Sequence, residues 1–336
     1  MMQRPPLRSR GAALLAAMLT VTLVASFAAA ALWQQWRAVE VETAERTRAQ
    51  AAWILLGALD WSRLILREDG RSSSADHLAE PWSVPLQEAR LSTFLAAERN
   101  VSQVDDGGID AIDAFLSGQI TDMQARLNLR NLFSDSAMAP IAQRQFTRLF
   151  ERLGLPQQEL ALLVDGLRRA HNGTGTDAPL MPQTADQLGW LGLSPTTVAL
   201  LEPHVAMLPM ATPVNLNTAD VDVLWAAIDG LDQASALKMV QARESRYFRS
   251  LGDVKTLLGG TLELNDSSVL STASGFFEVR GRLRMGQTTV EERSLVQRQG
   301  SQISVIWRQR NALPPARALA GAQDSANPLR TVTSPP

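Results

Sequence analysis

The sequence contains no cysteine, two lysines and three histidines among its 336 residues. Without cysteine the chain cannot form a disulfide, a zinc-thiolate site, an iron–sulfur cluster or a cysteine nucleophile. Its 32 basic residues are balanced by 34 acidic ones, so it lacks the excess positive charge of general nucleic-acid binders. A hydrophobic fraction of 45% indicates a folded protein, long enough for one large domain or two ordinary ones.

The sequence also lacks the common motifs of enzymes. His77, His171 and His204 are scattered, without the spacing of a metal-ligand pair. No P-loop, nucleophile elbow or dinucleotide-binding glycine pattern occurs. Acidic pairs in the segment 105–113 could act as acid–base groups, but turns and helix starts are the commoner use of such residues. We therefore expect no catalytic site.

Apolar residues are concentrated near the N-terminus. Residues 12–33 contain only Thr20, Thr22 and Ser26 as polar members, and the run would span roughly 30 Å as a helix, enough to cross a bilayer. Three arginines and no acidic residue precede it. This asymmetry predicts a single transmembrane helix with a cytoplasmic N-terminus and everything after residue 36 on the outer side.

Three interpretations of this segment remain open. A cleaved signal peptide would use an Ala-x-Ala site around Ala28 and Ala30, although the apolar run is longer than usual for such peptides. An uncleaved signal anchor is the second interpretation. In the third, residues 1–11 resemble a prepilin leader, which is cut before the apolar helix. Cleavage would then fall between Gly11 and Ala12.

The chain after the span divides by composition. Residues 34–71 have the apolar period of an amphipathic continuation of the helix. Strand-like patterns lie in 72–136 and 273–310, on either side of a helical block at 137–272. This order predicts a head with one sheet, into which a helical domain is inserted. The proline-containing tail 311–336 is predicted to be disordered.

The segment 117–132 resembles the signature of the K-type minor pseudopilins of bacterial type II secretion systems. AEPWSVPL at 79–86 is also similar to that family. The signature has substitutions at Ala125, Leu127 and Arg130. Its matching residues are Ser117, Gly118, Ile120, Asp122, Gln124, Arg126, Asn128, Leu129 and Leu132. The resemblance implies an α+β fold, with a long type IV pilin-like helix packed on an antiparallel sheet.

A second motif begins at Pro213 and resembles the opening of a helix-hairpin-helix unit, which also occurs in the insert of this family. We expect the unit to cover 213–262, with Asn215, Asn217 and Thr218 at its start and Gly230 in its turn. Thr218 is a suitable N-cap for the first helix.

Helix-hairpin-helix units also bind DNA, so the alternative function is a membrane-anchored DNA-binding protein of a competence or type IV pilus system. A phosphate-binding turn usually reads Pro-Gly-x-Gly, and here Asp229 and Asp232 replace a proline and a glycine. Charge over 213–260 is balanced, with six acidic and five basic residues. Little counterion release is then available, so we expect no nucleic-acid partner.

The resemblance implies a role at the tip of the pseudopilus. Major pilins have a glutamate at the fifth mature position, where it is thought to pair with the next subunit, and Ala16 stands there in this chain. The implied partners are the I- and J-type minor pseudopilins, prepilin peptidase and the inner membrane, with the head in the periplasm. No cofactor is certain and the metal ligands are unknown. Family members bind calcium in the head, but their acid-rich loop is replaced by 164–169 here.

Overall fold

The computed structural model describes residues 12–93, 114–134, 138–173, 178–260, 267–286 and 288–313. The chain divides after Ile54 into two units, which we describe separately. Gly11 and the acidic residues of 105–113 lie outside the described ranges.

The first unit contains the N-terminal part of helix α1 (Ala12–Ser72). By its length and composition, the helix is long and apolar enough to cross a membrane. Thr20 Oγ1 donates a hydrogen bond to Ala17 O at 2.9 Å, and Ser26 Oγ donates to Thr22 O at 2.8 Å. Because these hydroxyl groups are satisfied inside the helix, they are compatible with a lipid environment.

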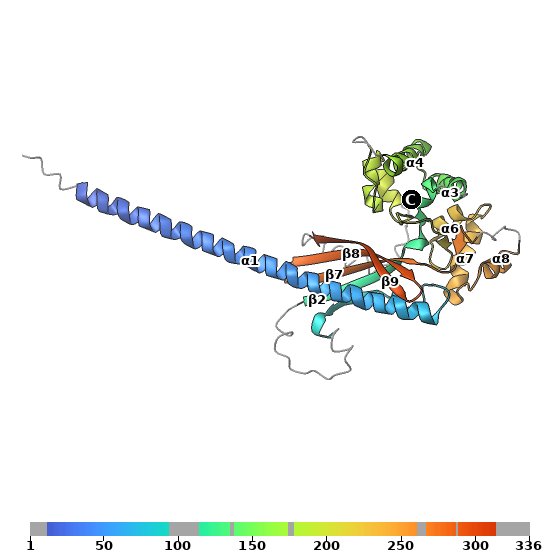
Figure 1. The fold of residues 1–336 in the computed structure, drawn as a ribbon, viewed down its shortest axis with the longest axis horizontal. Coiled ribbons are helices and arrows are strands. Elements are labelled where there is room, and N and C mark those ends of the chain that lie inside the picture. The colour runs from blue at the N-terminus through green and yellow to red at the C-terminus, as the bar shows by residue number, and fades with distance from the viewer. Residues whose placement is uncertain are drawn as a thin grey trace, which may run out of the picture. The chain divides into compact units, whose positions relative to one another are not determined.

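The second unit contains a five-stranded antiparallel sheet with the strand order β1-β2-β7-β8-β9 (Figure 1). Its strands are β1 (Leu86–Arg90), β2 (Ala114–Asp122), β7 (Phe276–Met285), β8 (Thr288–Gln299) and β9 (Gln302–Leu313). A 3₁₀ turn, η1 (Pro81–Ser83), precedes β1. Because β2 pairs directly with β7, everything between these two strands is inserted between neighbours in the sheet.

The two faces of the sheet pack against different parts of the chain. On one face, Leu59 and Leu66 of α1 form a buried cluster with Ile120, Phe277 and Val296. On the other face, a second cluster contains Met123, Ala206, Leu208, Phe276 and Leu295. Alternation along β7 and β8 therefore directs successive side chains to the helix on one side and to the insertion on the other.

The insertion is mostly helical and has its own core of buried leucine, phenylalanine and valine side chains. Its helices are α3 (Met138–Arg152), α4 (Gln157–Asn172), α5 (Pro195–Leu201), α6 (Val221–Ala227), α7 (Gln233–Ser245) and α8 (Leu251–Leu257). Its 3₁₀ helices are η2 (Met123–Ala125), η3 (Leu129–Phe133) and η4 (Ala185–Leu191). The predicted α+β class, with a helical domain inserted into an antiparallel sheet that packs on a long helix, is confirmed.

Four short strands connect distant parts of the insertion to one another. They are β3 (Leu127–Asn128), β4 (Val205–Ala206), β5 (Val214–Asn215) and β6 (Leu270–Ser271). β3 pairs in parallel with β4, and β5 pairs in parallel with β6. The start of the helical domain is thus tied to its middle, and its middle to its end.

The prediction of a disordered tail from residue 311 is wrong at its beginning. Asn311, Ala312 and Leu313 belong to β9 and pair with residues of β8. The strand ends where Pro314 follows, because proline has no N–H to donate to a ladder. Residues 314–336 lie outside the described ranges.

Candidate functional site

The pseudopilin signature and the hairpin motif meet in the fold. Asp122 ends β2, and Asn215 lies in β5 of the helical domain. Asn215 Nδ2 donates to Asp122 Oδ2 at 3.0 Å, and Thr218 Oγ1 donates to the same oxygen at 2.6 Å. All three residues are buried. Two motifs that are distant in sequence therefore form one polar contact between the sheet and the inserted domain.

The Asp122 carboxylate has hydrogen-bond donors around both of its oxygens. Oδ1 accepts from the backbone N–H of Gln124 at 2.8 Å, and Oδ2 also accepts from Ser274 Oγ at 2.7 Å. Burial raises the pKa of Asp122, while the hydrogen bonds from Thr218, Ser274 and Gln124 act in the opposite direction. With these donors in place, the carboxylate serves as a cross-link between chain segments.

Two further signature residues bond to the segment that leads into the hairpin. Gln124 Nε2 donates to Pro213 O at 3.1 Å, and its Oε1 accepts from Gly275 N at 2.6 Å. Asn128 Nδ2 donates to Thr212 Oγ1 at 2.9 Å. Gln124 thus satisfies two backbone groups, and Asn128 satisfies a hydroxyl group.

Sequence reasoning missed Asn131, which makes the most symmetrical of these contacts. Its Nδ2 donates to Thr212 O at 2.9 Å, while its Oδ1 accepts from Thr212 N at 3.1 Å. The family signature has an asparagine one position earlier, at Arg130. A second amide side chain, three residues after Asn128 and between leucines, is the signal that could have identified it.

Arg126 and Leu129 lie near this junction but take no part in its hydrogen-bond network. Leu129 is fully buried in the core of the helical domain. Arg126 Nη1 donates to Glu202 O at 3.4 Å, and burial lowers the pKa of its guanidinium. Leu129 therefore packs in the helical domain, whereas Arg126 bonds to it and also lies near charged residues of the sheet.

The beginning of the hairpin differs from the expectation in one respect. Asp220 is the N-cap of α6 and accepts from Val223 N at 2.7 Å, so the prediction of Thr218 as the cap is wrong. Thr218 does not cap the helix because its hydroxyl donates a hydrogen bond to Asp122 instead. Asn217 bonds to both backbone groups of Phe248, with its Nδ2 2.9 Å from the carbonyl and its Oδ1 2.8 Å from the N–H.

The turn between α6 and α7 contains Gly230 with a φ of 74°, a conformation that favours glycine. The Asp229 side chain next to it is 89% exposed, and Asp232 caps α7 by accepting from Ser235 N at 2.6 Å. Arg148 of α3 donates to Leu231 O at 3.2 Å. The turn thus presents a carboxylate to solvent and uses its carbonyls to contact a neighbouring helix.

A group of buried charges extends the junction to the end of α1. Arg298 of β8 donates to Asp69 Oδ2 at 2.8 Å and to Ser274 O at 2.9 Å. Its second terminal nitrogen bonds to Asp76 Oδ1. Asp76 Oδ2 accepts from Ser274 N at 2.7 Å. Sequence reasoning did not select these residues, because their pairing joins segments more than 200 residues apart.

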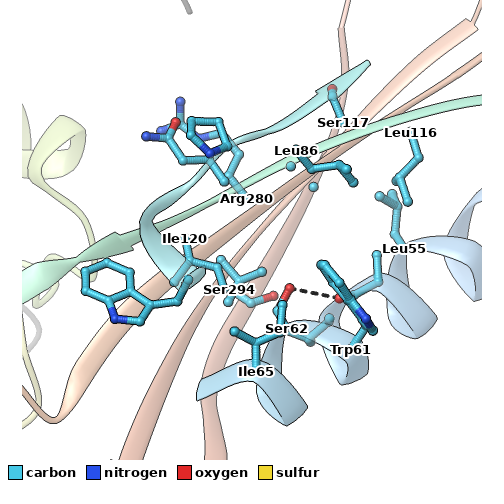
Figure 2. Close-up of a pocket in the computed structure, with 18 of the residues that line it drawn as sticks. Leu55, Trp61, Ser62, Ile65, Leu86, Leu116, Ser117, Ile120, Arg280 and Ser294 are labelled. Atoms are coloured by element: carbon cyan, nitrogen blue, oxygen red, sulfur yellow. Dashed lines mark hydrogen bonds between the residues drawn. The ribbon is translucent and has the colours of Figure 1, made fainter. Parts of the chain in front are cut away.

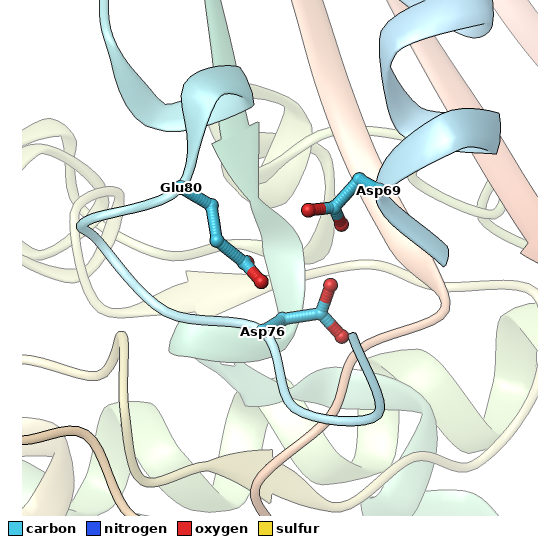
Figure 3. A group of neighbouring side chains, drawn as sticks. All are labelled: Asp69, Asp76 and Glu80. Atoms are coloured by element: carbon cyan, nitrogen blue, oxygen red, sulfur yellow. The ribbon is translucent and has the colours of Figure 1, made fainter. Parts of the chain in front are cut away.

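Glu80 completes the group, with its carboxylate pointing toward those of Asp69 and Asp76 (Figure 3). Glu80 Oε2 accepts from Trp82 Nε1 at 2.7 Å and from His77 N at 2.9 Å. Burial, with the Glu80 charge second, raises the pKa of Asp69 to about 6, although Arg298 acts to lower it. Burial likewise raises the pKa of Glu80.

These three acids are the group in the described part of the chain that could hold a metal ion, since each offers an oxygen within 4.8 Å of the others. In the segment 164–169, Asp165 is exposed and pairs with Arg169 at 2.9 Å within α4.

Of the residues expected at the processing site, Ala12 is the first residue of α1, and Ala16 lies one turn further along it. Both side chains are exposed in the isolated chain. Neither of these two side chains can carry a charge.

A cavity of about 270 Å³ lies between α1 and the sheet (Figure 2). Leu55, Trp61 and Ile65 of α1 face Leu86 and Leu116 across it. Its volume is slightly below the range of about 300–1,000 Å³ that is usual for small-molecule sites. We interpret it as imperfect packing between the helix and the edge of the sheet.

Two family profiles match the chain, and both describe protein K of the type II secretion system (T2SS). One covers residues 125–210 and the other covers residues 214–273. Together they include the signature from Ala125 onward and most of the hairpin motif.

Curated relatives and a solved structure agree with these matches. The type II secretion system protein K of Pseudomonas aeruginosa is 26% identical over 303 residues, which are 82% of this chain and 85% of the relative. That of Klebsiella pneumoniae is 28% identical over 335 residues, or 90% and 96%. A chain of the GspK-GspI-GspJ complex from enterotoxigenic Escherichia coli has a similar fold, with a TM-score of 0.63 and 20% identity over 80% of this chain and 98% of that one.

Proposed function

We propose that this chain, a minor pseudopilin of the type II secretion system protein K family, occupies the tip of the pseudopilus. There it initiates or caps the filament for protein export across the outer membrane. Its apolar N-terminal helix is suited to a membrane anchor within the pseudopilus. The same proposal includes insertion in the inner membrane with the head in the periplasm.

The observation on which the tip position rests is Ala16. In a shaft subunit, a glutamate at this point of the helix would pair with a neighbouring subunit. An unpaired carboxylate in hydrocarbon is costly. In a subunit that has no neighbour above it, alanine is therefore favoured over glutamate at this position. The helical domain adds a steric argument, because a domain built on one face of the pilin sheet leaves little room for close lateral packing.

The proposal implies processing by prepilin peptidase between Gly11 and Ala12, followed by methylation of Ala12. Mass spectrometry of the full-length protein, expressed in membranes with active peptidase, tests this step. We expect a mature N-terminus at Ala12 with one added methyl group. A terminus near residue 31, or an uncut chain, would contradict it.

The proposed partners are the I- and J-type minor pseudopilins, since the structural neighbour comes from a complex of three such proteins. We expect the mature protein to co-purify with both. Electron microscopy of filaments that contain a gold-labelled form of the chain then tests its position. Label at one end only is expected, and label along the shaft would refute the tip role.

The helix-hairpin-helix alternative predicts DNA binding. The exposed carboxylate of Asp229 beside Gly230 opposes a phosphate at the turn. A gel-shift titration at low salt is therefore expected to show no complex, and a salt-sensitive complex would favour the alternative. We propose no enzymatic activity for the chain.

A further inference from the structure

The cavity of about 270 Å³ between α1 and the sheet has mostly apolar walls and is lined by residues of the second unit (Figure 2). Leu55 and Ile65 of α1 and Leu116 of β2 contribute aliphatic side chains to it. The hydroxyl of Ser62, which also lines the cavity, donates to Ala58 O at 2.9 Å and is thus satisfied within the helix. A cavity of about 150 Å³ with apolar walls can hold benzene, so this one has room for a single aromatic side chain.

One buried polar side chain in the lining has an oxygen without a partner. Glu292 of β8 lines the cavity and is 3% exposed. Its Oε2 accepts from Arg310 Nε at 2.8 Å, whereas its Oε1 accepts no hydrogen bond from the described residues. Arg308 Nε lies 3.9 Å from Oε1, beyond hydrogen-bond distance. Because two arginines already offset the charge of the carboxylate, the missing partner is a neutral N–H or O–H donor and not a cation.

The rim of the cavity is apolar and exposed on the side of the segment 79–86, which resembles the protein K family. Trp82 of this segment is buried, while Val84 is 68% exposed. Pro81 and Pro85, which also line the cavity, are exposed as well. The segment leads into β1, an outer strand among those of the described sheet. An exposed apolar rim next to an apolar cavity is typical of a surface that another protein covers, because a small ligand would fill the cavity and leave the rim in water.

We propose that this cavity receives a tyrosine or tryptophan side chain of a neighbouring minor pseudopilin, whose O–H or N–H donates to Glu292 Oε1. These two side chains combine an apolar ring with one donor, and they are the common anchors of protein interfaces when buried in a pocket. A phenylalanine would fill the cavity but leave the oxygen unpaired. The packing between α1 and the sheet, imperfect in the isolated chain, is completed by the partner.

This inference rests on the proposed partnership with the I- and J-type pseudopilins and names the surface that serves it. Biolayer interferometry between the full-length protein in detergent and each purified partner tests it. Ala58→Phe places a ring in the cavity from within α1, so it should weaken binding of one partner at least about tenfold, as loss of an anchor does. Ala199→Phe is the matched control, since Ala199 is exposed on α5, and it should bind as the unchanged protein does.

Glu292→Gln keeps the shape of the side chain and changes its hydrogen bonding. Because Arg310 requires an acceptor, the amide NH₂ then faces the cavity, where it meets the donor of the partner. Binding should weaken roughly 5- to 100-fold. In Glu291→Gln, the control, the neighbouring carboxylate is on the other face of the sheet, where it bonds to Arg282 at 2.9 Å. This control should leave binding unchanged.

Two small probes separate the ring from its donor. p-Cresol has the shape and the hydroxyl of a tyrosine side chain, and p-xylene has a methyl group in place of that hydroxyl. In the same detergent, p-cresol should compete with the partner, and p-xylene should compete at least about fivefold more weakly. This preference should disappear in Glu292→Gln. If Ala58→Phe does not fold, Ala58→Leu and the competition by p-cresol provide the same comparison.

The outcomes separate this inference from the function on which it rests. If the unchanged protein binds neither partner, the proposed partnership fails and the inference fails with it. If both partners bind, and bind Ala58→Phe and Glu292→Gln equally well, the inference alone is overturned. If p-cresol binds to the protein without displacing a partner, the cavity is a small-molecule site, which also overturns the inference.

Discussion

Asn215 Nδ2 in the helical domain lies 3.0 Å from Asp122 Oδ2 at the end of β2, and both residues are almost completely buried. The same amide also donates to Asp76 O at 3.1 Å and to Ser274 Oγ at 3.0 Å. One side chain therefore contacts the sheet, the segment after α1 and the return to β7. This relationship makes Asn215 one of the buried residues that connect the inserted domain to the rest of the head.

Asn215→Asp should destabilise the protein by about 3–5 kcal/mol, because it places a second buried carboxylate beside Asp122 and removes a donor. The midpoint of urea unfolding, followed by tryptophan fluorescence, measures the change. Asn172→Asp is the matched control at an exposed helix end and should have little effect. Adding Asp122→Asn should restore part of the loss, with a coupling above about 1 kcal/mol, and strictly additive effects would contradict the proposed contact.

Arg298→Met should cost about 3–5 kcal/mol in unfolding free energy, because Asp69 and Asp76 would lose their cation while remaining buried. Arg71→Ala removes an exposed pair with Glu68 on the same helix and should change stability by less than about 1 kcal/mol. Thermal unfolding of both variants in parallel measures this difference in stability. If they were equally stable, the buried ion pairs would have no structural role.

Much of the fold could be predicted from local patterns. The alternation along β7 indicated a two-faced strand, and the composition change near residue 137 indicated an inserted helical domain. Asp122 and Asn215 were each selected from a motif. Their contact could not be predicted, because the sequence alone does not say which distant segments the fold brings together.

Both errors have a physical cause in tertiary contacts. The sequence Thr218-Ala219-Asp220 offers two good N-cap residues, and the contact of Thr218 with Asp122 decides between them. The tail was expected to begin at Asn311 because of its prolines, yet pairing with β8 keeps the strand regular up to Leu313. In both cases a tertiary contact overrides a rule that considers only neighbouring residues.

Gly281 of β7 lies directly under α1, where an added Cβ would be 3.1 Å from Leu55 Cδ2. Gly281→Val should therefore destabilise the head by about 1–3 kcal/mol, because the helix must move away from the sheet. Gly57→Ala is the opposite case. An added Cβ there meets nothing within 4 Å, so its higher helix propensity should stabilise α1 by up to about 1 kcal/mol.

Urea unfolding of both glycine variants tests this difference in sign. Leu55→Ala combined with Gly281→Val should cost less than the sum of the two single changes, since the smaller side chain makes room for valine. A stabilising Gly281→Val, or a destabilising Gly57→Ala, would show that the helix does not pack on the sheet in this way.

Asp220 links helix capping to acid stability. Burial acts to raise its pKa, but hydrogen bonds from His204 and from the Val223 N–H outweigh this effect and hold the pKa below its ordinary value. A depressed pKa in the folded state contributes stability above the unfolded value near pH 4, and this contribution is lost as the pH falls through the folded value. Asp220→Ala should cost about 0.5–2 kcal/mol at pH 6 through loss of the cap.

The difference in unfolding free energy between the unchanged protein and Asp220→Ala should therefore shrink as the pH is lowered from 4 toward 2. Urea unfolding at a series of pH values measures it. Asp165→Ala removes an exposed carboxylate that pairs with Arg169 and caps no helix, so it should cost no more than about 0.5 kcal/mol at pH 6. If the difference in unfolding free energy between the unchanged protein and Asp220→Ala stayed constant down to pH 2, the Asp220 side chain would contribute through packing and not through its charge.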